Sequence, residues 1–135
     1  MVKALEKIVR DDEEWRRRLT PQEFLILRRK GTEIKFSGEY LNHKGDGIYR
    51  CRGCKLPLFN SSSKYDSGSG WPSFNDAIRE HIGFKEDNSL GTLRTEIVCA
   101  RCDSHLGHIF DDGPGPTGKR YCTNSLSLDF VKSDT

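Results

Sequence analysis

The sequence has no long hydrophobic run. Its longest apolar stretches, such as Phe24 to Leu27, span four residues, far short of the roughly 20 that a helix needs to cross a bilayer. The N-terminus also lacks the apolar stretch of a signal peptide and the acid-poor composition of a transit peptide, because an acidic run begins at Asp11. We therefore expect no membrane span and a cytoplasmic location, although a processed organellar protein would have the same sequence features.

A charge excess of one sign is also missing. The 22 basic and 20 acidic residues leave a net charge of +2, too small to create a field that attracts nucleic acid or an anionic membrane. Hydrophobic residues make up 34% of the chain, but seven Phe, four Tyr and two Trp are too many large apolar side chains for a disordered protein. The 135 residues suit one folded domain over residues 1–135. We expect a monomer that binds neither nucleic acid nor a membrane.

The cysteines form an uneven set of five. Four of them make two Cys-x-x-Cys pairs, Cys51 with Cys54 and Cys99 with Cys102, separated by 44 residues. Two such pairs can supply the four thiolates of a tetrahedral structural zinc site. A redox dithiol and disulfides are the alternatives, but disulfides do not persist in the reducing compartment expected for a chain without a secretory signal. We predict one structural zinc ion per chain, with Cys122 left over.

The first 36 residues favour helices. Thr20 is a good N-cap, Pro21 suits the first helical position and Glu23 completes a capping box, so a helix should begin at Pro21 and stop at Gly31. The apolar spacing before it indicates an earlier helix. Residues 1–19 are therefore expected to form an N-terminal helical extension.

After Gly31 the pattern changes to that of an antiparallel β domain. Short apolar and β-branched runs are separated by Gly, Asn, Asp and Pro. The predicted strands cover residues 47–51, 56–59, 93–99, 108–110 and 119–131. Of the four histidines, His43 and His81 stand in no informative context and are expected at the surface.

The last predicted strand gives the unassigned thiol a context. Side chains alternate faces along a strand, so Arg120, Cys122 and Asn124 share one face, which Leu126, Leu128 and Phe130 would continue as an apolar row. A guanidinium near a thiol favours the thiolate. Cys122 is thus a candidate nucleophile; the alternative is an inert buried thiol in a strand core.

Two histidines follow the second cysteine pair. His105 and His108 continue its spacing of three, so a Cys2His2 metal site is arithmetically possible, but it would leave the first cysteine pair without a purpose. Two histidines together with an unassigned thiol suggest acid–base chemistry at a cysteine nucleophile. Trp71, held between Gly70 and Pro72, is either a plug over the core or the aromatic wall of a pocket.

A series of motifs between about Thr20 and Phe130 resembles the type B methionine sulfoxide reductases, which reduce the R epimer of methionine sulfoxide. The motifs are Gly31-Thr32-Glu33, the two Cys-x-x-Cys turns, Lys64 to Gly68 followed by Gly70 to Phe74, His105 to Phe110 with Asp112-Gly113-Pro114, and Arg120 to Ser125. Such an ordered series is far more specific than a single Cys-x-x-Cys.

The resemblance implies a fold, a metal site and a set of site residues. The fold is mainly β, with two antiparallel sheets in a β-tent-like arrangement, peripheral N-terminal helices and a structural zinc on the four paired cysteines. Cys122 is implied as the nucleophile and Trp71 as the acceptor of the substrate methyl group. The residues expected to shape and polarise the site or to bind substrate are His105, His108, Asn124, Arg120, Phe110 and Asp112.

The implied activity is that of a peptide-methionine (R)-S-oxide reductase, an enzyme of protein repair under oxidative stress. Thiolate attack on the sulfoxide sulfur needs an acid for the oxygen, which either histidine can supply, and leaves a sulfenic acid on Cys122. Many family members carry a second, resolving cysteine where this chain has Ser69. The sulfenic acid must then be reduced by an external thiol or by a thiol donated from the zinc site. We expect an external thiol: thioredoxin, glutaredoxin or a small thiol.

A different class of protein fits part of the pattern. A zinc-containing β-tent module could bind a ligand or a protein without catalysis, but it has no need of Arg120, Cys122 and Asn124 on one face with two histidines nearby. A zinc hydrolase or deaminase is disfavoured because four thiolate ligands leave no open metal position for water.

Overall fold

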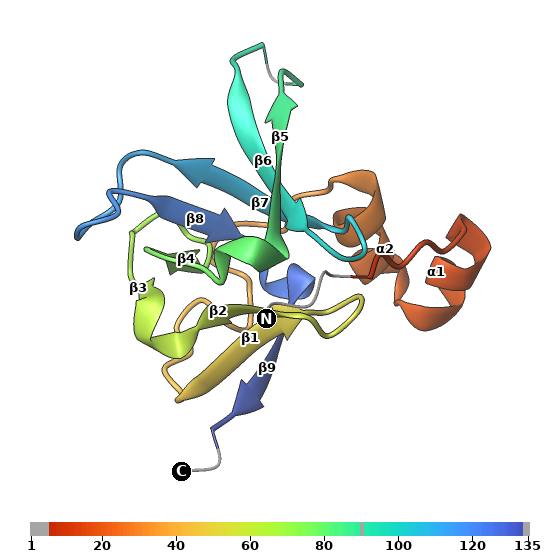
Figure 1. Ribbon diagram of the computed structural model, residues 1–135, viewed down its shortest axis with the longest axis horizontal. Coiled ribbons are helices and arrows are strands. Elements are labelled where there is room, and N and C mark those ends of the chain that lie inside the picture. The colour runs from red at the N-terminus through yellow and green to blue at the C-terminus, as the bar shows by residue number, and fades with distance from the viewer. Residues whose placement is uncertain (1–5, 90, 134–135) are drawn as a thin grey trace.

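The structure, a computed structural model, describes residues 6–89 and 91–133. Two short helices precede nine strands (Figure 1). The elements are α1 (Asp12–Arg18), α2 (Pro21–Arg29), β1 (Gly47–Cys51), β2 (Pro57–Asn60), β3 (Lys64–Tyr65), β4 (Ser73–Phe74), β5 (Ile82–Asp87), β6 (Arg94–Cys99), β7 (His105–Phe110), β8 (Arg120–Thr123) and β9 (Leu128–Lys132), with 3-10 turns η1 (Ser61–Ser63), η2 (Arg79–His81) and η3 (Ser125–Ser127).

The strands form two antiparallel sheets, which confirms the predicted mainly β fold. The smaller sheet has the order β2-β1-β9, and the larger has the order β3-β4-β8-β7-β6-β5. The smaller sheet lies below the larger one in Figure 1, with the helices to one side. Every neighbouring pair is antiparallel, as short connections between sequential strands favour.

Aromatic side chains join the two sheets. Phe59 of the smaller sheet stacks on Phe74 of the larger one, with ring centroids 4.2 Å apart and planes 11° apart. Tyr49 meets the same Phe74 ring edge-on at 5.2 Å, and burial raises the pKa of Tyr49 to about 12. Buried aromatic pairs stabilise a fold by more than the removal of their surface from water alone. This layer is therefore the centre of the core.

One histidine belongs to this aromatic layer. The His43 ring lies 4.3 Å from the Phe130 ring, centroid to centroid, and its Nδ1 lies 2.7 Å from the Tyr49 hydroxyl. The expected surface position of His43 is therefore wrong. Its sequence neighbours are polar and gave no sign of the packing partners, which come from β1 and β9.

The predicted capping box of α2 is confirmed. Thr20 Oγ1 accepts from the Glu23 amide at 3.1 Å, while Glu23 Oε1 accepts from the Thr20 amide at 2.8 Å, an arrangement worth about 1 kcal/mol. The helix ends at Lys30, which adopts the left-handed conformation with φ 57°. α2 packs on η3 and β7. Within the described residues, no helix is long and apolar enough to cross a membrane.

The long strand predicted over 119–131 is two strands in different sheets. β8 ends at Thr123, the chain turns through η3, and β9 pairs with β1 in the smaller sheet. The turn is closed by the Ser127 amide, which donates to the Asn124 carbonyl at 3.1 Å. Leu128 therefore reaches the core from another sheet and does not extend the face of Cys122. The short strands β3, β4 and β5 were not predicted, since two residues or a polar run give no alternation to detect.

The aromatic layer generates a stability prediction. Replacing Phe74 with Ala removes a fully buried ring that contacts both sheets, so the free energy of unfolding should fall by about 3–5 kcal/mol. The control is Phe84→Ala in β5, where the side chain is 52% exposed and the expected change is within about 0.5 kcal/mol. Urea unfolding measures both. Equal losses in the two variants would contradict the assigned core.

Candidate active site

Four cysteine side chains meet where the two sheets come together. Cys51 ends β1 and Cys99 ends β6, and each is followed by the tight turn that carries Cys54 or Cys102. Their Sγ atoms all lie within 4.8 Å of one another. The short separations join the two turns: Cys51 Sγ to Cys102 Sγ is 3.6 Å, and Cys54 Sγ to Cys99 Sγ is 3.5 Å. The two pairs, distant in sequence, thus form one cluster.

The cluster has the dimensions of a tetrahedral thiolate site. With zinc–sulfur bonds of about 2.3 Å, the sulfur atoms of such a tetrahedron lie about 3.8 Å apart, close to the separations measured here. All four cysteines are free, and 3.5 Å far exceeds the roughly 2.05 Å of a disulfide bond. Hydrogen bonds from the other cysteines and from Arg101 lower the pKa of Cys54 and favour its thiolate. The four cysteines are therefore placed to bind a metal ion.

A separate pocket of about 220 Å³ contains the fifth cysteine. Seven of the eight active-site residues expected from the sequence line it: Trp71, His105, His108, Phe110, Arg120, Cys122 and Asn124. The eighth, Asp112, lies outside the lining and holds Arg120 instead, with its carboxylate oxygens 2.8 Å from Nε and 3.2 Å from Nη2. Trp71 is thus a wall of the pocket, which answers the question that its loop position left open.

Strand register places the thiol and one histidine on the same face. Cys122 of β8 lies directly opposite His108 of β7, and His108 lies opposite Glu96 of β6. Side chains directly opposite each other on antiparallel strands share a face, with Cβ atoms about 4.5–5.5 Å apart. A row of thiol, imidazole and carboxylate therefore crosses the larger sheet.

A β-bulge brings the second histidine to that face. Residues three apart on a regular strand point to opposite faces, so His105 should point away from His108. Between Ile97 and Val98 the register shifts, and His105 lies opposite Val98. Val98 shares a face with Glu96, two residues before it. The His105 and His108 rings are therefore neighbours, with centroids 5.6 Å apart.

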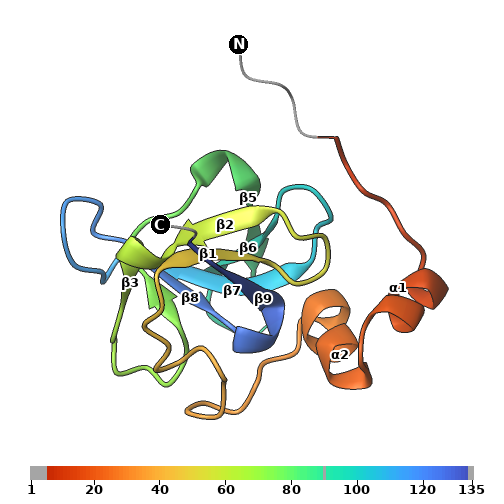
Figure 2. The same ribbon diagram turned by 90° about the horizontal axis from the view of Figure 1, so that it is seen from below.

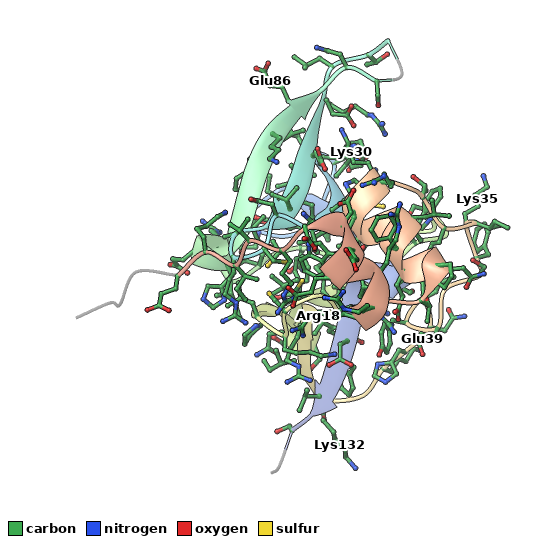
Figure 3. The ribbon with its side chains drawn as sticks, turned by 90° about the vertical axis from the view of Figure 1, so that its right-hand side faces the viewer. Arg18, Lys30, Lys35, Glu39, Glu86 and Lys132 are labelled. Carbon is green, nitrogen blue, oxygen red and sulfur yellow. The ribbon has the colours of Figure 1, made fainter. Side chains whose placement is uncertain are left out.

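Each histidine has a buried carboxylate as a partner. His105 Nδ1 lies 2.7 Å from Glu96 Oε2, and His108 Nε2 lies 2.7 Å from Asp87 Oδ2. Lys30, at the end of α2, reaches both carboxylates, with Nζ 3.2 Å from Glu96 and 3.6 Å from Asp87. Figure 3 shows Lys30 beside the β5–β6 hairpin. One ammonium group thus links the two histidine–carboxylate pairs.

Burial and hydrogen bonding set the charge of two groups in these pairs. Burial lowers the pKa of His105, although the adjacent Glu96 opposes this effect, so His105 is neutral at pH 7. Asp87 is ionised, because the hydrogen bonds from His108 and Ser89 hold the pKa of its carboxyl far below the usual value. Ionised Asp87 therefore lies 2.7 Å from His108 Nε2.

Burial keeps Cys122 as a thiol in the free protein. Burial raises the pKa of Cys122, and the opposing effects of the Arg120 charge and of hydrogen bonding with Ser69 and Arg120 do not overcome it. Arg120 does lower the pKa of Cys122, as expected, but the expected net shift toward the thiolate is wrong, because burial outweighs this effect. The sequence could not show how deeply β8 is buried.

A chain of two hydrogen bonds connects the Trp71 ring to Asn124, the residue that follows β8. Asn124 Oδ1 accepts from the Glu33 amide at 3.0 Å, and the Glu33 carbonyl accepts from Trp71 Nε1 at 3.0 Å. Gly70, with φ +93°, lies where a Cβ atom would come within 2.7 Å of Lys35 Cβ. Asn124 therefore fixes the indole as well as lining the pocket.

Several residues of the site were not predicted from the sequence. Arg94 and Thr32 line the pocket, and Glu96 and Asp87 hold the histidines. Glu96 carried a weak signal, because a carboxylate directly precedes the apolar run Ile97-Val98 of a predicted strand. The Cys2His2 alternative is excluded, since both histidines are engaged by carboxylates and the metal-ligand cluster among the described residues consists of the four cysteines.

Comparisons with known proteins agree with these motifs. The SelR domain family model matches residues 19–132. The chain is 55% identical over 130 residues to the mouse protein named methionine-R-sulfoxide reductase B3, mitochondrial, covering 96% of this chain and 51% of the mouse protein. It is 58% identical over 120 residues to the peptide methionine sulfoxide reductase MsrB of Synechococcus sp. (strain RCC307), covering 88% of each.

The relatives differ in length. The chain spans about half the length of the mouse protein and 58% of the rice protein named peptide methionine sulfoxide reductase B1, chloroplastic. It covers most of the length of bacterial and archaeal relatives, such as the MsrB of Methanosarcina mazei, which is 51% identical and covered over 94% of its length. Since both the family model and full-length relatives match, the chain belongs to the SelR domain family, that of the type B methionine sulfoxide reductases.

Proposed function

We propose that this protein reduces the R epimer of methionine sulfoxide in oxidised proteins to methionine, as a peptide-methionine (R)-S-oxide reductase. The observation that carries the proposal is the pocket in which Cys122, faced by His108 across the β8–β7 register, lies with Trp71, Arg120 and Asn124. The names of the relatives, which are methionine sulfoxide reductases, support it.

The reaction begins with substrate orientation. The methyl group of the sulfoxide packs on the face of Trp71, whose ring is held in place through Glu33 and Asn124. Phe110 adds an apolar wall, with the Arg120 guanidinium 4.4 Å from its ring centroid. Asp112 acts through Arg120, because it holds the guanidinium against the pocket.

Proton transfer accompanies attack on sulfur. The Cys122 proton passes through His108 to the sulfoxide oxygen, while the Cys122 sulfur attacks the substrate sulfur. The substrate S–O bond breaks, the oxygen bonds to the Cys122 sulfur, and the bond between the two sulfur atoms is released as methionine leaves. The substrate sulfur is thereby reduced by two electrons, and the Cys122 sulfur is oxidised by two electrons to a sulfenic acid. We assign this transfer to His108 because it lies opposite Cys122 and has ionised Asp87 behind it. His105, neutral and more deeply buried, orients the site.

An external thiol completes the cycle. A thiol of thioredoxin, glutaredoxin or a small molecule attacks the sulfenic sulfur, releases water and forms a mixed disulfide, which a second thiol reduces. Ser69 stands in the loop beside Cys122 and has no sulfur to close an internal disulfide. The free cysteines other than Cys122 are the four of the cluster.

We propose that the four-cysteine cluster holds one structural zinc ion. Cys51, Cys54, Cys99 and Cys102 would bind it, and the filled coordination shell would join the turn after β1 to the turn after β6 without contributing to the reaction. We also propose a single domain over residues 1–135 with residues 1–19 as an extension, since the family model begins at residue 19. A monomer in the cytoplasm is the proposed state.

A non-catalytic binding module remains the alternative function. The zinc cluster and an aromatic pocket would serve it equally well. The two histidine–carboxylate pairs around Cys122 favour the enzyme, because a binding module gains nothing from buried acid–base pairs that are costly to desolvate.

Two substitutions should separate the nucleophile from the metal ligands. Cys122→Ser should abolish reduction of an R-sulfoxide peptide and leave the zinc content and the free energy of unfolding unchanged, because Cys122 is not in the cluster. In contrast, Cys54→Ser should release zinc and destabilise the fold, since metal binding and folding are coupled. Activity assays, metal analysis and urea unfolding measure the three properties.

Two results would contradict these assignments. Zinc loss in Cys122→Ser would mean that the ligands are wrongly identified. Retained zinc and an unchanged unfolding midpoint in Cys54→Ser would rule out the structural site.

The lack of a resolving thiol at Ser69 generates a further prediction. After one turnover without reductant, Cys122 of the parent should be a sulfenic acid that dimedone traps as a mass adduct. Ser69→Cys should instead form an internal disulfide with Cys122, because the Ser69 side chain lies close enough to hydrogen-bond that thiol. The disulfide should lower the yield of the dimedone adduct. Ser62→Cys, in η1 and exposed, is the control and should behave like the parent.

Peptide mapping of the oxidised proteins gives the decisive result. A disulfide between Cys122 and a cluster cysteine in the parent, formed at the rate of turnover, would overturn the one-cysteine mechanism. Equal adduct yields in Ser69→Cys and Ser62→Cys would show that the Trp71 loop does not face β8 in solution.

A further inference from the structure

The N-terminal segment, residues 6–18, lies outside the region that the family model matches and runs along the outer side of both cysteine turns (Figure 2). It ends in α1, whose N-cap is Asp11, with Asp11 Oδ1 accepting from the Glu14 amide at 2.9 Å. The segment precedes the catalytic part of the chain in sequence and contributes nothing to the pocket lining. Several of its contacts are with the two cysteine turns.

The start of the segment is bonded to the second turn. The Ile8 amide donates to the carbonyl of Arg101, which lies between the cysteines of that turn, at 2.8 Å. Lys7 Nζ donates to the Ala100 carbonyl at 2.9 Å and lies 3.0 Å from Asp103 Oδ1. Three of the contacts therefore fall within five consecutive residues of the turn, from Cys99 to Asp103.

The remainder of the segment is bonded to the first turn. Arg10 Nη1 donates to the carbonyl of Gly53, which lies between Cys51 and Cys54, at 3.1 Å. The Trp15 ring packs on the same glycine, since a Cβ atom on Gly53 would lie 3.1 Å from the indole. The contact is thus a close one that a larger residue at position 53 would disturb.

The Trp15 ring packs against two arginine side chains as well as against the first turn. Trp15 is fully buried, and the guanidinium groups of Arg10 and Arg28 lie 4.7 Å and 4.5 Å from its ring, on favourable cation–π geometry. Arg28 Nη1 also donates to the Cys102 carbonyl at 2.8 Å. The ring is therefore part of a continuous set of contacts that joins α1 and α2 to both turns.

We propose that the N-terminal segment is an outer wall of the metal site that holds its two turns together and slows the exchange of the bound ion. The inference rests on the zinc site proposed above. A four-coordinate thiolate site loses its metal when a turn swings away or a competing ligand reaches a sulfur. Groups outside the ligand shell that restrain the ligands raise metal retention. Cys54 is the ligand most accessible to a competing ligand, because it is partly exposed while the other three cysteines are buried.

The test compares two double variants of the full chain loaded with zinc. Lys7→Ala with Arg10→Ala removes the charged side chains that hydrogen-bond to the two turns. Arg17→Ala with Arg18→Ala removes the same charge from the same segment, but these side chains pair with Glu13 and Glu14 on the exposed side of α1. A chromophoric chelator in excess reports the rate of zinc transfer, and circular dichroism verifies that each variant is folded.

We expect zinc release from the Lys7/Arg10 variant to be about tenfold faster than from the parent, and release from the Arg17/Arg18 variant to match the parent. Equal release rates in the two variants would overturn the role of the segment while leaving the zinc site intact. A parent protein that holds no zinc would overturn the metal site and this inference together, although Cys122 could still reduce the sulfoxide.

Discussion

The close approach of β7 and β8 at Gly107 is the constraint on which the active site depends. A Cβ atom at this position would lie 1.9 Å from the Cys122 carbonyl oxygen, so a larger residue would force the two strands apart. With the strands in register, His108 lies opposite Cys122, and the bulge at Ile97 and Val98 turns His105 to the same face. Backbone pairing therefore places both histidines near the thiol before any side-chain contact is made.

Burial and charge oppose each other throughout this pocket. Burial raises the pKa of Cys122 and lowers the pKa of His105, so both groups are neutral in the free protein at pH 7. The charged groups lie behind the histidines: two buried carboxylates that hydrogen-bond to the imidazoles and are bridged by Lys30. A neutral thiol is protected from unwanted oxidation, and in the proposed reaction it becomes a nucleophile when the substrate oxygen accepts its proton.

The local and non-local features of the site were predictable to different degrees. The capping box at Thr20 and the two Cys-x-x-Cys turns are encoded within a few residues, and both are present. The ordered series of motifs identified the pocket residues through a family resemblance. The bulge, the crossing of the chain to another sheet after Thr123 and the net pKa shift of Cys122 depend on strands far apart in sequence. Periodicity along one segment cannot report such pairings, which is why it predicts a single strand over 119–131.

The central claim is that one thiol, without a second cysteine or a reductant, reduces one sulfoxide. Its most direct test is a single-turnover measurement on the parent protein with all external thiols removed, using separate R and S epimers of a methionine sulfoxide peptide. The account predicts one methionine formed per protein chain from the R epimer, and none from the S epimer. No methionine before a reductant is added, or equal amounts from both epimers, would contradict it.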